Sequence, residues 1–160
     1  SDEVAMDAGG IGFIGLPYVR RAKALAISED TSPPLLPSPF TVATEDYALS
    51  RRLYLYTAAN PTNRLTTEFV EFVLSPAGQA IVEKSGFVSQ TIEPESTNRP
   101  DSAPKPYLQA TENAKRLNVT LRFKLGSTQL DGKAQRDVVR IMDTMVRPEN
   151  RGKQLLLVRF

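Results

Sequence analysis

The sequence contains neither cysteine nor histidine, and tryptophan is also absent. Without cysteine there is no disulfide, thiol nucleophile or thiolate ligand, and without histidine there is no imidazole base or ligand. Zinc sites built from these residues, cysteine proteases and serine–histidine triads are therefore excluded. These absences favour a chain with no catalytic activity, no metal site and no cofactor.

Long apolar runs are also missing, since no stretch approaches the roughly 18 residues that cross a bilayer. The N-terminus, Ser1 to Met6, is acidic and lacks the basic and apolar regions of a signal peptide. We expect either a cytosolic protein or a mature or excised piece of a longer one, and we favour the excised piece. The 160 residues, of which 41% are hydrophobic, suffice for one domain or two small ones.

Charge is distributed unevenly along the chain. Residues 1–92 carry seven basic and ten acidic side chains, whereas residues 107–160 carry eleven basic and five acidic ones. A basic C-terminal third is compatible with an anionic partner surface. The interpretation that we favour is a solvated helix face whose arginine and lysine stems cover apolar surface.

A proline-rich stretch divides the sequence. Residues 93–106 hold four prolines and no large apolar side chain. Such a segment has nothing to pack into a core, so we expect a semi-extended linker between two domains, residues 1–92 and 107–160.

Hydrophobic spacing predicts an α/β fold with strands in both domains. In the first domain we expect two helices: one over residues 63–74, and a second that begins with Ser75 as N-cap and Pro76 and ends at Gly86. In the second domain we expect a strand, a turn, a helix from Asp131 to about Val146 and a buried parallel strand, arranged β-α-β. The predicted strands cover residues 11–16, 22–27, 47–57, 118–123 and 155–158, the predicted turn covers 126–128, and 28–39 is expected to be irregular because of its prolines.

Two short motifs have a functional and a structural interpretation. The glycines of residues 10–15 match the dinucleotide fingerprint, but they lie inside an apolar run and Pro17 follows where a helix must open, so close backbone packing is favoured. The cluster Ser50, Arg51 and Arg52 offers a hydroxyl and two guanidinium groups to a tetrahedral anion. In the alternative that we favour, one arginine is solvated and the other pairs with Glu45 or Asp46.

Four segments of the first domain form a recognisable set: residues 10–15 (Gly-Ile-Gly-Phe-Ile-Gly), 47–56 (Tyr-Ala-Leu-Ser-Arg-Arg-Leu-Tyr-Leu-Tyr), 69–82, which include Leu74-Ser75-Pro76-Ala77-Gly78-Gln79, and 86–88 (Gly-Phe-Val). With them, residues 10–92 resemble the C-terminal part of the periplasmic phosphate-binding proteins that serve ABC transporters, which have a type II periplasmic-binding-protein fold. The family's Thr-Gly-Ser anion loops and its aspartate lie upstream of the segments that match, so the resemblance carries over no ligand-contacting motif.

Residues 107–160 resemble the opening β-α-β unit of the OmpA-like, peptidoglycan-associating domain. The matching segments are residues 122–131 (Arg-Phe-Lys-Leu-Gly-Ser-Thr-Gln-Leu-Asp), the helix that follows, and 155–158 (Leu-Leu-Leu-Val). The chain ends at Arg159 and Phe160, before the aspartate and arginine that hold the peptidoglycan peptide in that family, and Arg159 stands where the family has glycine.

The two resemblances imply an extracytoplasmic solute-binding protein for phosphate or a similar oxyanion, located in the periplasm and held to the cell envelope. Implied partners are the membrane subunits of an ABC transporter and peptidoglycan, with no nucleic acid. The alternative is a structural envelope protein whose binding-like lobe is a protein–protein interface. Because both predicted domains are incomplete, we expect their strand edges to be covered in a homodimer or by an exchanged element.

Overall fold

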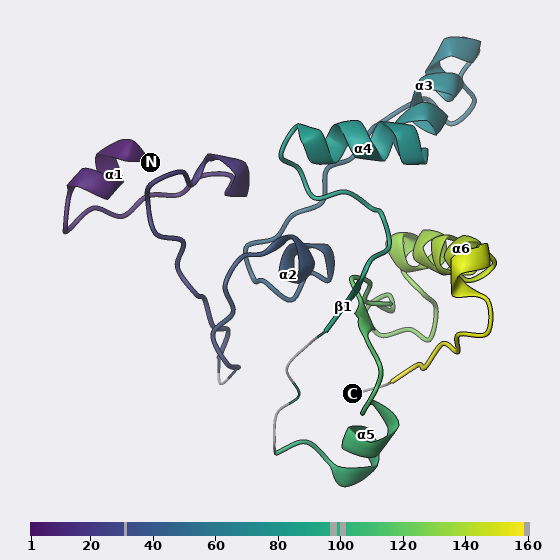
Figure 1. Ribbon diagram of the computed structural model, residues 1–160. Coiled ribbons are helices and arrows are strands. Elements are labelled where there is room, and N and C mark those ends of the chain that lie inside the picture. The colour runs from purple at the N-terminus through teal and green to yellow at the C-terminus, as the bar shows by residue number, and fades with distance from the viewer. Residues whose placement is uncertain (31, 97–98, 100–101, 159–160) are drawn as a thin grey trace. The chain divides into compact units, whose positions relative to one another are not determined.

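The computed structural model describes residues 1–30, 32–96, 99 and 102–158, and the chain divides into two compact units, Ser1–Thr91 and Ile92–Phe160 (Figure 1). Both units consist mainly of helices and irregular segments. Among the described residues the only sheet has two strands, and no described helix is long and apolar enough to cross a membrane.

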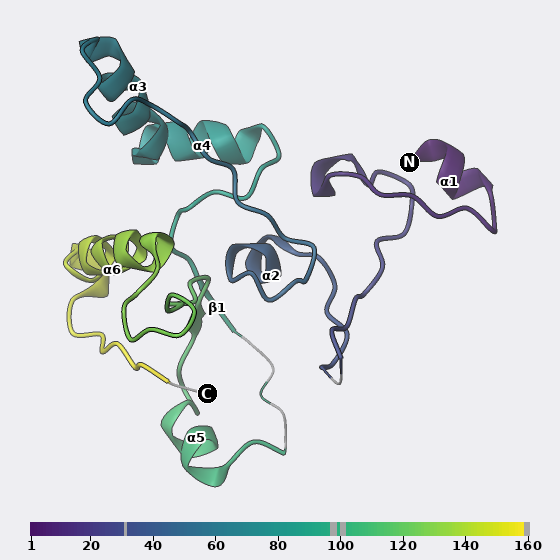
Figure 2. The ribbon, with the colours of Figure 1, turned by 180° about the vertical axis from the view of Figure 1, so that it is seen from behind.

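The first unit contains two consecutive helices, α3 (Arg64–Leu74) and α4 (Pro76–Lys84), which meet at Ser75 and diverge from there (Figures 1 and 2). Asn63 caps α3 by accepting a hydrogen bond from the Leu65 amide at 2.9 Å. Gly86, just beyond α4, has a φ of +84°, a conformation that glycine adopts without strain. Both helices predicted for this region are confirmed. The other elements of the unit are α1 (Asp2–Met6), the 3₁₀ helix η1 (Leu16–Tyr18) and α2 (Pro39–Ala43).

The strands predicted for the first unit are wrong. Residues 11–16, 22–27 and 47–57 have no ladder partners, and pairing is confined to a single bridge between Ile27 and Leu35. Ile11 and Phe13, expected in a buried strand, are more than 80% exposed. An apolar run becomes a strand only when a second strand satisfies its backbone groups, and the described residues supply none.

The short helix α2 lies in the segment expected to be irregular. Ser38 caps it in a reciprocal capping box: its hydroxyl accepts from the Thr41 amide at 3.1 Å, and its own amide donates to the Thr41 hydroxyl at 2.9 Å. Pro39 occupies the first helical position, where a missing N–H costs nothing. Phe40, on this helix, is one of the few buried apolar side chains of the described chain.

In the second unit β1 (Pro94–Glu95) pairs antiparallel with β2 (Arg116–Leu117) in the register Pro94 to Leu117 and Glu95 to Arg116. The helix α5 (Lys105–Ala110) follows β1 in the chain. The stretch expected to be a linker therefore includes β1 and the start of α5, while residues 97–98 and 100–101 lie outside the described residues.

The predicted helix of the second unit is α6 (Gly132–Met145), followed by the 3₁₀ helix η2 (Pro148–Asn150). Asp131 caps α6 as predicted, since its Oδ1 accepts from the Ala134 amide at 2.7 Å. The turn predicted at 126–128 is present, with Gly126 at a φ of +67° between the bridged residues Phe123 and Leu130.

The flanking strands of the predicted β-α-β unit are wrong. Residues 118–123 contribute only the bridge residue Phe123, and residues 155–158 are unpaired and exposed. The described fold is mixed but dominated by helices, with an antiparallel sheet where parallel strands were expected. The α/β prediction therefore holds only in part. Arg159 and Phe160 lie outside the described residues.

Candidate functional site

The predicted anion-binding cluster lies in an irregular segment that follows α2. Arg52 makes a two-point ion pair with Glu45: its Nε lies 2.5 Å from one carboxylate oxygen and a terminal nitrogen lies 2.9 Å from the other. The two side chains are 29% and 19% exposed. A partly buried, bidentate pair of this kind is stronger than an ordinary surface pair. The positive charge of Arg52 is therefore balanced by the carboxylate of Glu45.

The remaining members of the cluster are more open. Arg51 is exposed and makes no ion pair among the described residues, and Ser50 is half-buried, with its backbone N–H donating to the Tyr47 carbonyl at 2.9 Å. This is the alternative arrangement that the sequence favoured, with one arginine solvated and one paired. The three residues are neighbours, but only Arg51 has a guanidinium group that is not already paired with a carboxylate.

The Leu-Ser-Pro-Ala-Gly-Gln segment, residues 74–79, contains two buried residues, Gly78 and Gln79. The Ser75 hydroxyl caps α4 by accepting from the Gly78 amide at 3.2 Å. Gly78 lies against the end of α3, so that a Cβ atom there would lie 2.1 Å from the Phe72 carbonyl oxygen. Glycine is therefore required at this position by the close approach of two backbones.

Gln79 has a structural role that the sequence did not reveal. The residue is 6% exposed, and both ends of its side-chain amide form hydrogen bonds. Nε2 donates to the Val73 carbonyl at 2.8 Å, and Oε1 accepts from the Gln90 amide at 2.6 Å. One buried side chain thus connects the end of α3, the start of α4 and the segment after Gly86.

The glycine-rich segment 10–15 does not form a dinucleotide site. No strand precedes it and no helix opens within it; η1 begins only at Leu16. The structural interpretation also applies to Gly86, where an added Cβ would lie 2.7 Å from Cβ of Pro17. In this unit the glycines therefore matter for close packing and for backbone conformation.

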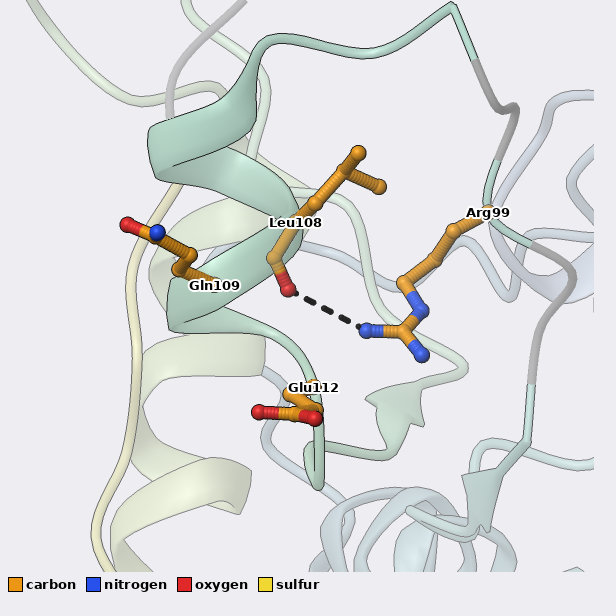
Figure 3. Close-up of a pocket in the computed structure, with 4 residues that line it drawn as sticks. All are labelled: Arg99, Leu108, Gln109 and Glu112. Carbon is orange, nitrogen blue, oxygen red and sulfur yellow. Dashed lines mark hydrogen bonds between the residues drawn. The ribbon is translucent and has the colours of Figure 1, made fainter.

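The second unit has a shallow pocket with a cavity volume of about 350 Å³, lined by Arg99, Leu108, Gln109 and Glu112 (Figure 3). The Arg99 guanidinium donates to the Leu108 carbonyl of α5 at 3.2 Å. The single arginine is thus already bonded to backbone, and Glu112 adds a carboxylate. This lining is poorly suited to an anion, and the sequence did not predict it.

A buried carboxylate on α6 was also missed. Asp137 is 1% exposed and accepts from Lys133 at 2.7 Å and from Arg140, one turn away on either side. Burial lowers the pKa of Arg140, the nearby charge of Asp137 opposes that shift, and Arg136 adds a smaller lowering effect. The sequence did contain a signal for these ion pairs, because Lys133 lies four residues before Asp137 and Arg140 three residues after it. Within the described residues no cluster of potential metal ligands is found.

Comparison with known proteins gives a partial likeness. The phosphate-binding protein PstS of Borreliella burgdorferi is 30% identical over 89 residues, which cover 54% of this chain and 31% of that protein. The PstS proteins of Staphylococcus epidermidis and Staphylococcus aureus are 32% and 33% identical over 92 residues, covering 54% of this chain and 28% of each relative. The chain thus spans about a third of the length of these relatives. No family model and no solved structure matches the chain, and these relatives lend no support to the OmpA-like resemblance.

Proposed function

We propose that the chain is part of an extracytoplasmic solute-binding protein for phosphate or a similar oxyanion, without enzymatic activity. The observation that carries this proposal is the likeness to three phosphate-binding proteins over about half of the chain. In such a protein the anion lies between two lobes, held by amides and hydroxyls, and closure of the lobes follows binding.

The role proposed for residues 1–92 is structural support of one lobe. The helices α3 and α4 provide it, because the segment around Gly78 and Gln79 is fixed by backbone approach and by two partly buried hydrogen bonds. The direct contribution of this chain to the anion is limited to Ser50 and Arg51, with Arg52 available only if Glu45 releases it. The remaining donors come from parts of the solute-binding fold that this chain does not span.

Residues 107–160, reached through 93–106, are proposed to hold the protein to the cell envelope by associating with peptidoglycan. The partners proposed for the complete protein are phosphate or another small oxyanion and the membrane subunits of an ABC transporter, which places it in the periplasm. The support for the envelope role is the motif resemblance of residues 122–131 alone.

Isothermal titration tests the binding proposal in two parallel experiments, each with phosphate and with sulfate as a control. The chain by itself is expected to bind phosphate poorly. A chimera in which residues 1–91 replace the corresponding segment of the Staphylococcus aureus protein is expected to bind phosphate in preference to sulfate. The matched control is the same relative with that segment deleted. A chimera that folds, as judged by circular dichroism, yet binds neither anion contradicts the proposal.

A second candidate function is a structural envelope protein in which the binding-like lobe is a protein–protein interface. The exposure of the apolar stripe on α3 favours it, since Leu65 is 68% exposed, Phe69 58% and Phe72 48%. A contiguous exposed apolar surface of this kind marks an interaction site. This candidate predicts a homodimer at micromolar concentration in light scattering, converted to monomer by Leu65→Ser with Phe69→Ser. A monomeric wild-type protein excludes the homodimer.

A further inference from the structure

The helix α6 exposes apolar side chains on a face that does not contribute to the core. Its buried face contains Ala134 and Ile141, at 1% and 8% exposure. Val139, Met142 and Val146 are 57%, 62% and 81% exposed and follow one another at intervals of three and four residues. That spacing places them on one stripe of the helix surface, separate from the buried face.

A basic stripe lies next to this apolar one. Arg136 and Arg140 are one turn apart on α6, and Arg147 follows the end of the helix seven residues later. Arg136 and Arg147 are exposed and make no ion pair among the described residues. Since residues three apart are neighbours on a helix, Arg136 lies beside Val139.

The acidic groups on this side do not neutralise the stripe. Asp137 is buried beneath it and binds Lys133 and Arg140, and Asp143 is exposed between the basic and the apolar residues. With Lys133 and Arg140 held by Asp137, the exposed charges of this face are the two arginines Arg136 and Arg147 and the single carboxylate of Asp143. Arg136 also lies close enough to Arg140 to lower its pKa slightly, an effect smaller than that of Asp137, which already balances the charge of Arg140.

We propose that this face of α6 is a docking surface for an anionic phospholipid membrane, with Val139, Met142 and Val146 in the headgroup layer and the exposed Arg136 and Arg147 on lipid phosphates. An apolar stripe flanked by arginine is the pattern of a helix that lies in a membrane interface. The long arginine stems can cover apolar surface while their charged ends reach the headgroups. The face is a single convex helix surface, which suits a fluid bilayer better than a shaped protein groove.

The test is sedimentation of the full chain with vesicles of phosphatidylglycerol and, separately, of phosphatidylcholine. The proposal predicts at least tenfold stronger binding to phosphatidylglycerol, weakened by a rise in salt from roughly 0.1 to 0.5 M because surface charge is screened. Each arginine near an anionic surface strengthens binding about fivefold. Arg136→Gln with Arg147→Gln is therefore expected to weaken binding about twentyfold.

The apolar stripe is tested by Met142→Ser with Val146→Ser, for which we expect about a tenfold loss on phosphatidylglycerol. The matched control is Lys105→Gln with Lys115→Gln, which removes two exposed charges from the same unit but outside the stripe, with an expected loss below about threefold. Circular dichroism confirms that each variant keeps its helix content.

Equal binding to both lipids overturns the proposal, as do equal losses in the arginine and lysine variants. It is also overturned if the Met142 and Val146 changes have no effect, or if millimolar inorganic phosphate displaces the chain from vesicles. A vesicle-free dimer that these apolar changes dissociate assigns the face to a second copy of the chain and also overturns it.

Discussion

The side-chain carbonyl of Gln79 accepts a hydrogen bond from the backbone N–H of Gln90, eleven residues further along the chain, at 2.6 Å. The other end of the same amide donates to the Val73 carbonyl at 2.8 Å. A buried amide that is bonded at both ends favours one arrangement of the two segments, because loss of either bond leaves a partly buried group without its partner.

Gln79→Ala is therefore expected to destabilise the first unit by about 1–2 kcal/mol, because the partly buried Gln90 amide and Val73 carbonyl both lose their partner. Chemical denaturation followed by circular dichroism measures this change. The matched control is Gln90→Ala, which keeps the backbone donor and removes only an exposed side chain. Equal losses in the two variants would show that the bond contributes nothing.

Two helix glycines are expected to respond to alanine in opposite directions. A Cβ at Gly78 would lie 2.1 Å from the Phe72 carbonyl oxygen, and backbone cannot move there without opening the α3–α4 turn. A Cβ at Gly132 has no neighbour closer than 3.8 Å. We expect Gly78→Ala to cost about 3 kcal/mol or more, and Gly132→Ala to stabilise α6 by about 0.5–1 kcal/mol. Thermal and denaturant unfolding of the two variants are the measurement.

The sequence predicts the elements whose signals lie within a few neighbouring residues, and it fails for those that depend on distant segments. The helices α3, α4 and α6 were predictable because Asn63, Ser75 and Asp131 satisfy the first amide groups within a few residues of sequence. The strands depended on distant partners. Residues 47–57 and 155–158 have a strand-like pattern, but no described segment pairs with them.

For the candidate site, the sequence predicted that one of the two arginines pairs with an acidic residue. It did not predict which arginine pairs, or with which carboxylate. The pairing of Arg52 with Glu45 depends on the turn after α2, where Glu45 adopts a φ of +60°. Nothing in the sequence marks Gln79 as buried, because its partners are backbone groups contributed by Val73 and Gln90. For Asp137 the spacing of its basic neighbours indicates ion pairs, but not burial, because an aspartate between basic residues on a helix is usually solvated.

Asp137→Asn is expected to destabilise the second unit, because Lys133 and Arg140 would keep their charges beside a neutral side chain. Breaking a buried pair costs about 3–5 kcal/mol, and since these cations are 20% and 24% exposed we expect about 2–4 kcal/mol. The helix signal of α6 during denaturation measures the loss. Asp143→Asn, which removes an exposed carboxylate from the same helix, serves as the control and is expected to change stability by less than about 0.5 kcal/mol.

The last prediction concerns Ser50, Arg51 and Arg52 as anion ligands. Glu45 holds the Nε and one terminal nitrogen of Arg52, so the carboxylate competes with any phosphate for that edge of the guanidinium. Glu45→Gln removes the competing charge and is expected to strengthen phosphate binding by the chain several-fold, as followed by titration. Glu68→Gln provides the matched control, because Glu68 pairs with Arg64 at 2.6 Å on an exposed part of the same unit and loses the same charge. If the two variants bind phosphate equally, the gain reflects net charge alone, and Ser50, Arg51 and Arg52 are not the ligands. A gain confined to Glu45→Gln that disappears when Arg51→Gln is added identifies the two arginines as a joint site.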